Sequence, residues 1–258
     1  MSRTIETVDF DRLKNLLKNP FAINQQVALM LIKSMEETIQ DYELKVLMTN
    51  SIDKIKWCIE YDLINKVKMI VLKDTWIDVR VIVKCVDTEY LYLTDNVHWS
   101  SFEGTLGNMT KLKTLSLARN RLAKFPVSIL ELKDLKKLYL NQNRLDRLPA
   151  GIMHMKGLKA LNLSHNRFKK LPTQIIGLES LEELNLSNNR LTKLPNSIAA
   201  LTNLRKLVLS NNKLQTIPLS IMRAKQLETL YLYQNPVCKN SQLLEDLQTC
   251  LPNTDIRF

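Results

Sequence analysis

A 23-residue unit occurs six times between Leu112 and Asn235, and it constrains the fold more than any other feature of the chain. In the first copy, leucines stand at 112, 115, 117 and 122, asparagine at 120, proline at 126 and isoleucine at 129. The later copies begin, without slippage, at Leu135, Leu158, Leu181, Leu204 and Leu227. A fixed period of this length is the signature of a solenoid, in which each unit buries its apolar face against its neighbours.

Each unit begins with the alternation of a β-strand. Leu115 and Leu117 point into the core, and Ser116 between them points outward. Successive strands therefore stack in parallel at a spacing of about 4.8 Å. A recurring asparagine follows each strand, where its amide can satisfy buried backbone groups; the six are Asn120, Asn143, Asn166, Asn189, Asn212 and Asn235. A proline then fixes the backbone as the chain enters the return segment; the five are Pro126, Pro149, Pro172, Pro195 and Pro218.

This pattern resembles the leucine-rich repeat over about half of the chain. The 23-residue version, with its Leu-Pro pair and following isoleucine, is similar to the intracellular repeats of the Ras-group-related proteins and of bacterial repeat proteins. The resemblance implies an α/β fold, a right-handed solenoid or horseshoe with a parallel β-sheet on its concave side. It also implies a protein-binding scaffold or the sensing half of a larger protein.

The segments outside the repeats divide the chain further. Residues 1–65 contain short amphipathic stretches and predict an N-terminal helical cap; the alternative is a domain with its own binding or signalling role. Residues 66–111 form a transition with strand-like alternation around Met69 and from Ile77 to Cys85, then a degenerate repeat at Leu91-x-Leu93. After the repeats at 112–237, residues 238–258 predict a C-terminal cap, with a helix from Ser241 to Cys250 and a last short strand.

The cysteines and apolar runs bear on the compartment. Cys58, Cys85, Cys238 and Cys250 form no Cys-x-x-Cys pair. Cys238 and Cys250 are either bridged or free, and we favour two free thiols packed under the terminal helix. No run of 18 uncharged apolar residues and no secretory signal is seen, so we expect a cytoplasmic protein.

No residue pattern typical of catalysis is present. The three histidines, His98, His154 and His165, form no metal-binding spacing, and no phosphate-binding glycine loop or nucleophile elbow occurs. We therefore expect a monomer that is not an enzyme and that uses no cofactor and no metal.

Recognition is expected on the concave sheet face. The strand residues that flank the inward leucines place aromatic, amide and basic side chains there, and aromatic side chains often dominate binding energy. The predicted partner-binding residues are Tyr139, Asn162, Asn185, Tyr231, Tyr233, Lys137 and Lys206. The sequence does not identify the protein partner.

Charge defines a second surface. Residues 112–234 contain 21 Lys and Arg but only 7 Asp and Glu. One basic row directly follows the asparagines, at Arg121, Arg144, Arg167, Arg190 and Lys213, and a second lies three residues later, at Lys124, Arg147, Lys170 and Lys193. The two rows should lie along one flank. The alternative function is therefore binding of nucleic acid, membrane or another anionic surface, while solvated side chains without a ligand are the simpler interpretation.

Overall fold

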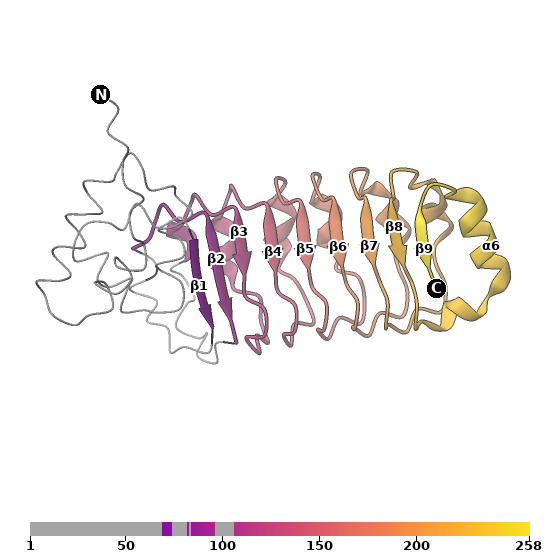
Figure 1. Cartoon of the computed structure of the whole chain (residues 1–258), viewed down its shortest axis with the longest axis horizontal. Coiled ribbons are helices and arrows are strands. Elements are labelled where there is room, and N and C mark those ends of the chain that lie inside the picture. Colours follow the sequence, from indigo (N-terminus) through magenta and orange to yellow (C-terminus); the bar gives the residue numbers. More distant parts are fainter. Residues whose placement is uncertain (1–68, 74–81, 83, 96–105) are drawn as a thin grey trace, which may run out of the picture.

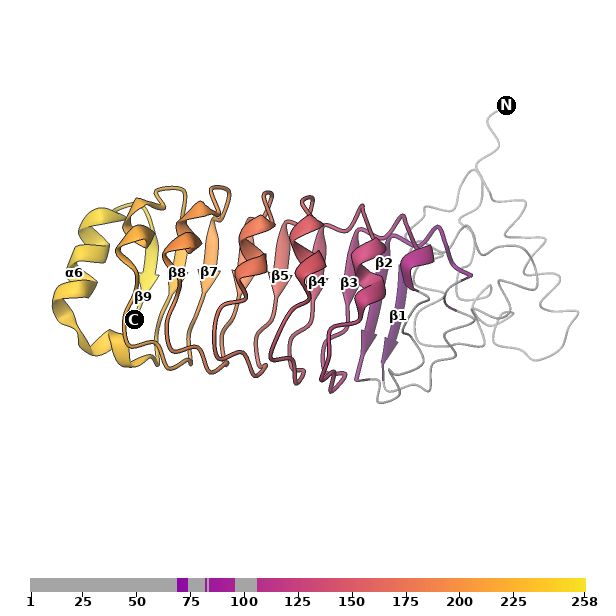
Figure 2. The ribbon, with the colours of Figure 1, turned by 180° about the vertical axis from the view of Figure 1, so that it is seen from behind.

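The computed structural model describes residues 69–73, 82, 84–95 and 106–258. Over these residues the chain winds into an elongated solenoid (Figure 1). Nine described strands form one sheet, in the order of the chain, and every pair of neighbours is parallel. The sheet covers one face of the molecule, and short helical segments cover the opposite face (Figures 1 and 2).

The strands are short and regularly spaced along the chain. They are β1 (Met69–Lys73), β2 (Tyr90–Thr94), β3 (Thr114–Ser116), β4 (Lys137–Tyr139), β5 (Ala160–Asn162), β6 (Glu183–Asn185), β7 (Lys206–Val208), β8 (Thr229–Tyr231) and β9 (Asp255–Arg257). The described 3-10 helices are η3 (Leu106–Asn108), η4 (Val127–Glu131), η5 (Ala150–His154), η6 (Thr173–Gly177), η7 (Asn196–Ala200), η8 (Leu219–Arg223) and η9 (Pro236–Lys239), and the α-helix α6 (Ser241–Cys250) follows them.

The inward leucines form one continuous column through the coil, as the 23-residue period predicts. Leu115 pairs in register with Leu138, and the same position continues through Leu161, Leu184, Leu207 and Leu230. All of these side chains are at most 1% exposed. The predicted solenoid with a parallel sheet is therefore confirmed, and no repeat between Leu112 and Leu227 departs from the common register.

The return segments follow from the proline and isoleucine of each repeat. Pro126, with an extended backbone at φ −70°, directly precedes η4, and the equivalent prolines precede η5 to η8. Ile129 and its counterparts point back into the core and are at most 2% exposed. Since only five residues lie between Pro126 and the buried Leu132, each return segment has room for a short 3-10 helix and not for a long α-helix.

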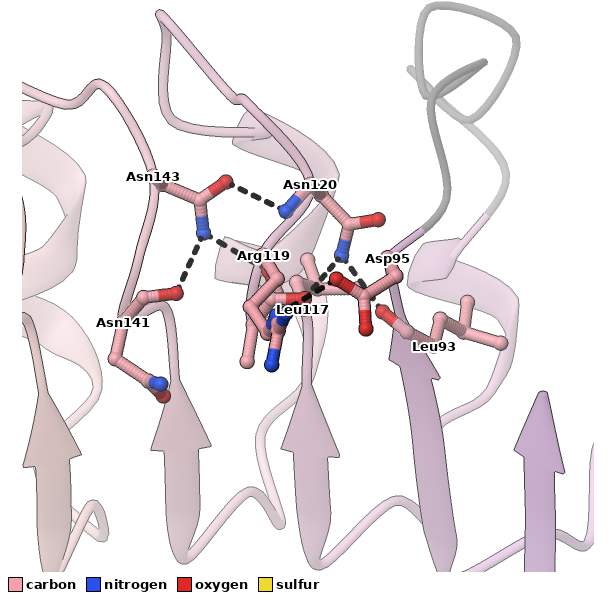
Figure 3. A network of polar contacts seen from close by, with 8 residues as sticks. Leu93, Asp95, Leu117, Arg119, Asn120, Asn141 and Asn143 are labelled. Atoms are coloured by element: carbon pink, nitrogen blue, oxygen red, sulfur yellow. Dashed lines mark hydrogen bonds and ion pairs between the residues drawn. The ribbon is translucent and has the colours of Figure 1, made fainter. Parts of the chain in front are cut away.

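The asparagines form a ladder between neighbouring coils (Figure 3). The Oδ1 atom of Asn143 accepts hydrogen bonds from the backbone N–H groups of Asn120, at 3.1 Å, and Leu122, at 2.8 Å. Its Nδ2 group donates to the carbonyl oxygens of Leu117 and Leu140, both at 2.9 Å. The predicted role of these residues is confirmed, because each amide satisfies buried backbone groups of two successive coils.

The residue before each ladder asparagine has a left-handed backbone. The positions concerned are Arg119, Gln142, His165, Asn188, Asn211 and Gln234, with φ between 53° and 62°, and Asp95 at the end of β2 has the same conformation, with φ 59°. This conformation turns the chain sharply off the strand without a glycine. Residues other than glycine adopt this conformation at a cost in free energy. The hydrogen bonds of the neighbouring buried asparagine hold the turn in place.

The transition region is partly as predicted. β1 confirms strand structure around Met69, and β2 confirms the degenerate repeat, since Leu91 pairs in register with Leu115. The strand predicted from Ile77 to Cys85 is wrong at its described residues: Ile82 is helical, and Lys84 lies in a turn. Ile82 and Cys85 are nonetheless fully buried. They lie three residues apart, and the N–H group of Cys85 donates to the carbonyl oxygen of Ile82 at 2.9 Å, so these core positions belong to a turn and not to a strand.

The C-terminal segment closes the coil as predicted. Helix α6 spans Ser241–Cys250, and the Oδ1 atom of Asn240 caps it by accepting from the N–H group of Leu243 at 3.1 Å. The chain then returns as β9, which pairs with β8. Cys238 and Cys250 are free thiols, as is Cys85. The predicted N-terminal helices lie outside the described residues, and the boundaries 1–65, 66–111, 112–237 and 238–258 stay predictions.

Candidate functional site

The predicted binding residues share one surface, which we call the sheet face. It consists of the outward side chains of β2 to β9 and of the residues that follow each strand. Register places its central column in the order Tyr92, Ser116, Tyr139, Asn162, Asn185, Val208, Tyr231 and Arg257. Lys137 and Lys206 lie in the preceding column, and Tyr233 lies two residues beyond Tyr231. All seven predicted residues therefore come together on this face.

Three tyrosines gather at the N-terminal end of the sheet face. Tyr90 and Tyr92 belong to β2, and Tyr139 belongs to β4, with Ser116 of β3 in register between Tyr92 and Tyr139. Burial, together with the neighbouring phenols of Tyr139 and Tyr90, raises the pKa of Tyr92. Ser116 is only 5% exposed although it points to the outer side of the sheet. The small serine therefore lies between Tyr92 and Tyr139 in register, and we call Tyr90, Tyr92 and Tyr139 the aromatic cluster.

The predicted binding residues do not include Tyr90 and Tyr92. They flank Leu91 in a repeat that lies 24 residues before the next one and not 23. The alternation Tyr90-Leu91-Tyr92-Leu93 was the available signal, because outward residues of a stacked strand must share the face of Tyr139.

The centre of the sheet face offers hydrogen-bond donors. Asn162 and Asn185 are adjacent in register and half-buried. The Oδ1 atom of Asn162 accepts from the N–H group of Ser164, and that of Asn185 accepts from the N–H group of Ser187, each at 3.0 Å. These bonds fix which end of each amide is oxygen. Both Nδ2 groups are left without an acceptor among the described residues and can donate to a ligand.

At the C-terminal end of the sheet face, residues of the last strand, β9, contact Tyr231. The Arg257 guanidinium lies 4.9 Å from the centre of the Tyr231 ring, and the Tyr231 hydroxyl donates to Asp255 at 3.3 Å. Arg257 and Asp255 also form an ion pair at 3.1 Å. Tyr231 is therefore half-buried in a polar network, whereas Tyr233 is 40% exposed. Of the two, Tyr233 is the more accessible to a partner.

The basic rows lie on a different surface, which we call the basic flank. It consists of the turns 121–124, 144–147, 167–170, 190–193 and 213–216, which follow the asparagine ladder at the edge where the strands end. These turns contain ten Lys and Arg side chains and one acidic residue, Asp146. All ten basic residues are exposed.

Ion pairs are concentrated at the opposite edge, where the strands begin. Lys113 pairs with Glu89 at 2.7 Å, Lys156 with Glu179 at 2.6 Å and Lys159 with Glu182 at 2.8 Å, and Arg205 pairs with Glu228. Each of these pairs joins two neighbouring coils. On the basic flank, the one ion pair among the described residues is that of Arg147 with Asp146.

In the ranges that the structure describes, no three His, Cys, Asp or Glu side chains lie close enough to hold a metal ion. The helices described there are all too short or too polar to span a bilayer.

Comparison with known proteins identifies the repeat. The family model described as "Leucine rich repeat" matches residues 87–145, 133–191 and 179–237. A leucine-rich repeat protein from Leptospira interrogans has a similar structure, with a TM-score of 0.51 and 27% sequence identity. An internalin from Listeria monocytogenes has a similar fold, with a TM-score of 0.54 and 17% identity. Each match covers 76% of this chain, which spans 62% of the other chain. No curated protein sequence matches.

Proposed function

Since the chain belongs to the leucine-rich repeat family, we propose that it is a non-catalytic interaction module whose sheet face binds a protein partner. The observation that carries this proposal is the aromatic cluster of Tyr90, Tyr92 and Tyr139, next to the free amide donors of Asn162 and Asn185. Tyrosine supplies a large contact area with few rotatable bonds, so little entropy is lost when it becomes buried.

The rigidity of the sheet supports the same proposal. Every strand from β2 to β8 is paired on both sides, so the backbone beneath these side chains is already ordered before a partner arrives. Preorganisation of this kind lowers the cost of association. The amide groups of Asn162 and Asn185 and the exposed Lys137 and Lys206 favour a partner that presents carbonyl or carboxylate oxygens at the centre of the face.

The experiment is a quantitative affinity capture from lysate of the native host. The wild-type chain is compared with a Tyr92→Ala/Tyr139→Ala variant, and the captured proteins are identified by mass spectrometry. A partner of the sheet face is retained by the wild type and lost by the variant. Binding of that purified partner, measured by calorimetry, should weaken by at least about 2 kcal/mol, or roughly 30-fold.

A matched control separates the sheet face from the basic flank. The Arg144→Glu/Arg167→Glu variant changes exposed side chains outside the sheet face, and it should keep the partner. If the arginine reversals abolish capture and the tyrosine changes have no effect, the sheet face is not the interface. Melting curves of both variants check that folding is intact.

We also propose that the module works as a monomer in a reducing, cytoplasmic compartment. The free thiols of Cys85, Cys238 and Cys250 favour such a setting. Fractionation of the host cells with a thiol-labelling reagent tests this, since oxidised Cys238 or Cys250 in the native protein would contradict it.

A further inference from the structure

The basic flank carries charge that the protein itself does not neutralise. The five turns of the basic flank hold ten exposed Lys and Arg side chains, and Asp146 is the one acidic residue within them. The other acidic residue described where the strands end, Asp95, is paired with Arg119 at 2.7 Å. Arg121, Arg144, Arg167 and Arg190 have no ion-pair partner among the described residues. Parallel strands bring the backbones at successive members of one row to about 5 Å from each other, which is less than the screening length of about 8 Å in physiological salt. The side chains therefore repel one another, and a bound anionic surface would lower this repulsion.

The opposite edge shows that this arrangement is not a general property of the coil. There, basic residues such as Lys113, Lys156 and Lys159 each find a glutamate on a neighbouring coil. Among the described residues, the paired glutamates lie where the strands begin, whereas the edge where the strands end carries Asp95, which is paired with Arg119, and Asp146. Charge is segregated between the two edges of one rigid body.

From this segregation we infer that the basic flank is a second interaction surface, which docks on the anionic face of a lipid bilayer. The flank is an outer edge of the solenoid, formed where each coil turns away from its strand (Figure 1). It extends for roughly 20 Å across five turns at the spacing of parallel strands. An outer edge of this kind can contact a planar surface along its whole length. The lipid headgroups of a bilayer already lie in a plane, so they lose little conformational freedom when the edge binds.

Anionic polymers fit this edge less well than a bilayer does. Binding of single-stranded nucleic acid relies on aromatic side chains that stack on the bases, but Phe125 and Phe168 beside the flank are buried, with exposed fractions of 7% and 0%. An acidic peptide would lose conformational freedom on docking, and exposed ion pairs repay that loss poorly. The core positions along the flank are likewise buried, as Leu145 and Leu191 are. Attachment to the bilayer is therefore electrostatic and does not involve insertion.

Sedimentation of the full chain with lipid vesicles tests the inference. Vesicles of phosphatidylcholine with phosphatidylserine should bind the protein at low salt, and vesicles of phosphatidylcholine alone should not. Each basic side chain near an anionic membrane contributes about fivefold to the affinity. The Arg144→Glu/Arg167→Glu variant should therefore bind at least about 20-fold more weakly, and salt of roughly 0.5 M should release the wild type.

A matched control removes the effect of net charge. Lys133→Glu/Arg223→Glu changes the charge by the same amount at exposed residues outside the basic flank, and it should bind vesicles nearly as the wild type does. Equal losses in both variants would overturn the inference, as would binding that survives high salt. Tighter binding to a duplex oligonucleotide or to polyglutamate than to the vesicles, at equal salt, would also overturn it. Because the tyrosine variants leave the flank intact, failure here is separate from failure at the sheet face.

Discussion

A single asparagine side chain connects two neighbouring coils through four hydrogen bonds. The Oδ1 atom of Asn166 accepts from the N–H group of Leu145 at 2.9 Å. Its Nδ2 group lies within hydrogen-bonding distance of the carbonyl oxygens of Leu140, Leu163 and Ser164. No other short side chain offers an acceptor and two donors in the same plane. The position therefore specifies asparagine by its chemistry.

Replacement of Asn166 by alanine should lower the free energy of unfolding by about 2 kcal/mol or more, because it leaves buried backbone groups without partners. Arg167→Ala, at the exposed neighbouring position, should cost less than about 0.5 kcal/mol. Denaturant titration of the two variants measures both values. Equal losses would contradict the assignment of the ladder.

The raised pKa of Tyr92 predicts a pH dependence. Burial and the nearby phenols favour the neutral form in the folded state, so this residue should ionise above the ordinary value near 10. The stabilisation is fully present at neutral pH and is lost as the pH rises above 10 and through the raised pKa. Tyrosinate absorbance of the wild type minus that of Tyr92→Phe gives the titration curve, and an ordinary pKa would contradict the aromatic cluster.

Among the elements, α6 closes the C-terminal end of the core. Leu247 is fully buried and Leu251 is 2% exposed, and the helix packs next to η8. Without it, the apolar interior of the last coil would be open to water, which solenoids avoid by capping their ends.

The variant Leu247→Ala should therefore destabilise the protein by about 2–5 kcal/mol, through lost burial and the cavity that remains. Leu244→Ala makes the same chemical change at a residue that is only half-buried, and it should cost clearly less. Thermal or denaturant melts compare the two. Equal effects would mean that α6 does not cap the core through Leu247.

The elements also show what the sequence can and cannot predict. Where the period is strict, position in the repeat determines burial and direction, so β3 to β8 and the ladder could be predicted. Where it drifts, alternation alone is ambiguous, because a buried turn and a strand can show the same apolar pattern. Cys85 illustrates this ambiguity, because the alternation predicts it in a strand, whereas it is buried in a turn that begins at Ile82. The contact of Arg257 with Tyr231 joins residues of different repeats and depends on side-chain geometry that no sequence pattern encodes.

At the scale of the whole molecule, the described solenoid presents surfaces of different chemistry. The net charge of +11 could be read from the sequence, and so could the basic rows. The pairing of Lys159 with Glu182 and of Arg205 with Glu228 depends on which coils become neighbours. The segregation of charge between the two edges therefore became visible only in the structure.

Stability at this scale depends on how the N-terminal end of the sheet is covered. β1 pairs with β2 over five residues, from Met69–Tyr90 to Lys73–Thr94, and Ile70 of β1 is fully buried. A fragment that begins at Thr88 lacks β1, Ile82 and Cys85, so the edge of β2 and its core leucines, Leu91 and Leu93, become exposed. Exposed apolar surface and an unpaired strand edge favour aggregation.

We therefore expect fragment 88–258 to aggregate or to lose cooperative unfolding, whereas fragment 66–258 keeps β1 and isolates the contribution of residues 1–65. Light scattering after size-exclusion chromatography and thermal melts measure both outcomes.

If residues 1–65 are a cap, fragment 66–258 should also lose stability relative to the full chain. If it melts like the full chain, those residues form an appended domain with a task of its own. If fragment 88–258 stays monomeric and melts cooperatively at the same temperature, the N-terminal end of the coil needs no cover, and the capping argument is wrong.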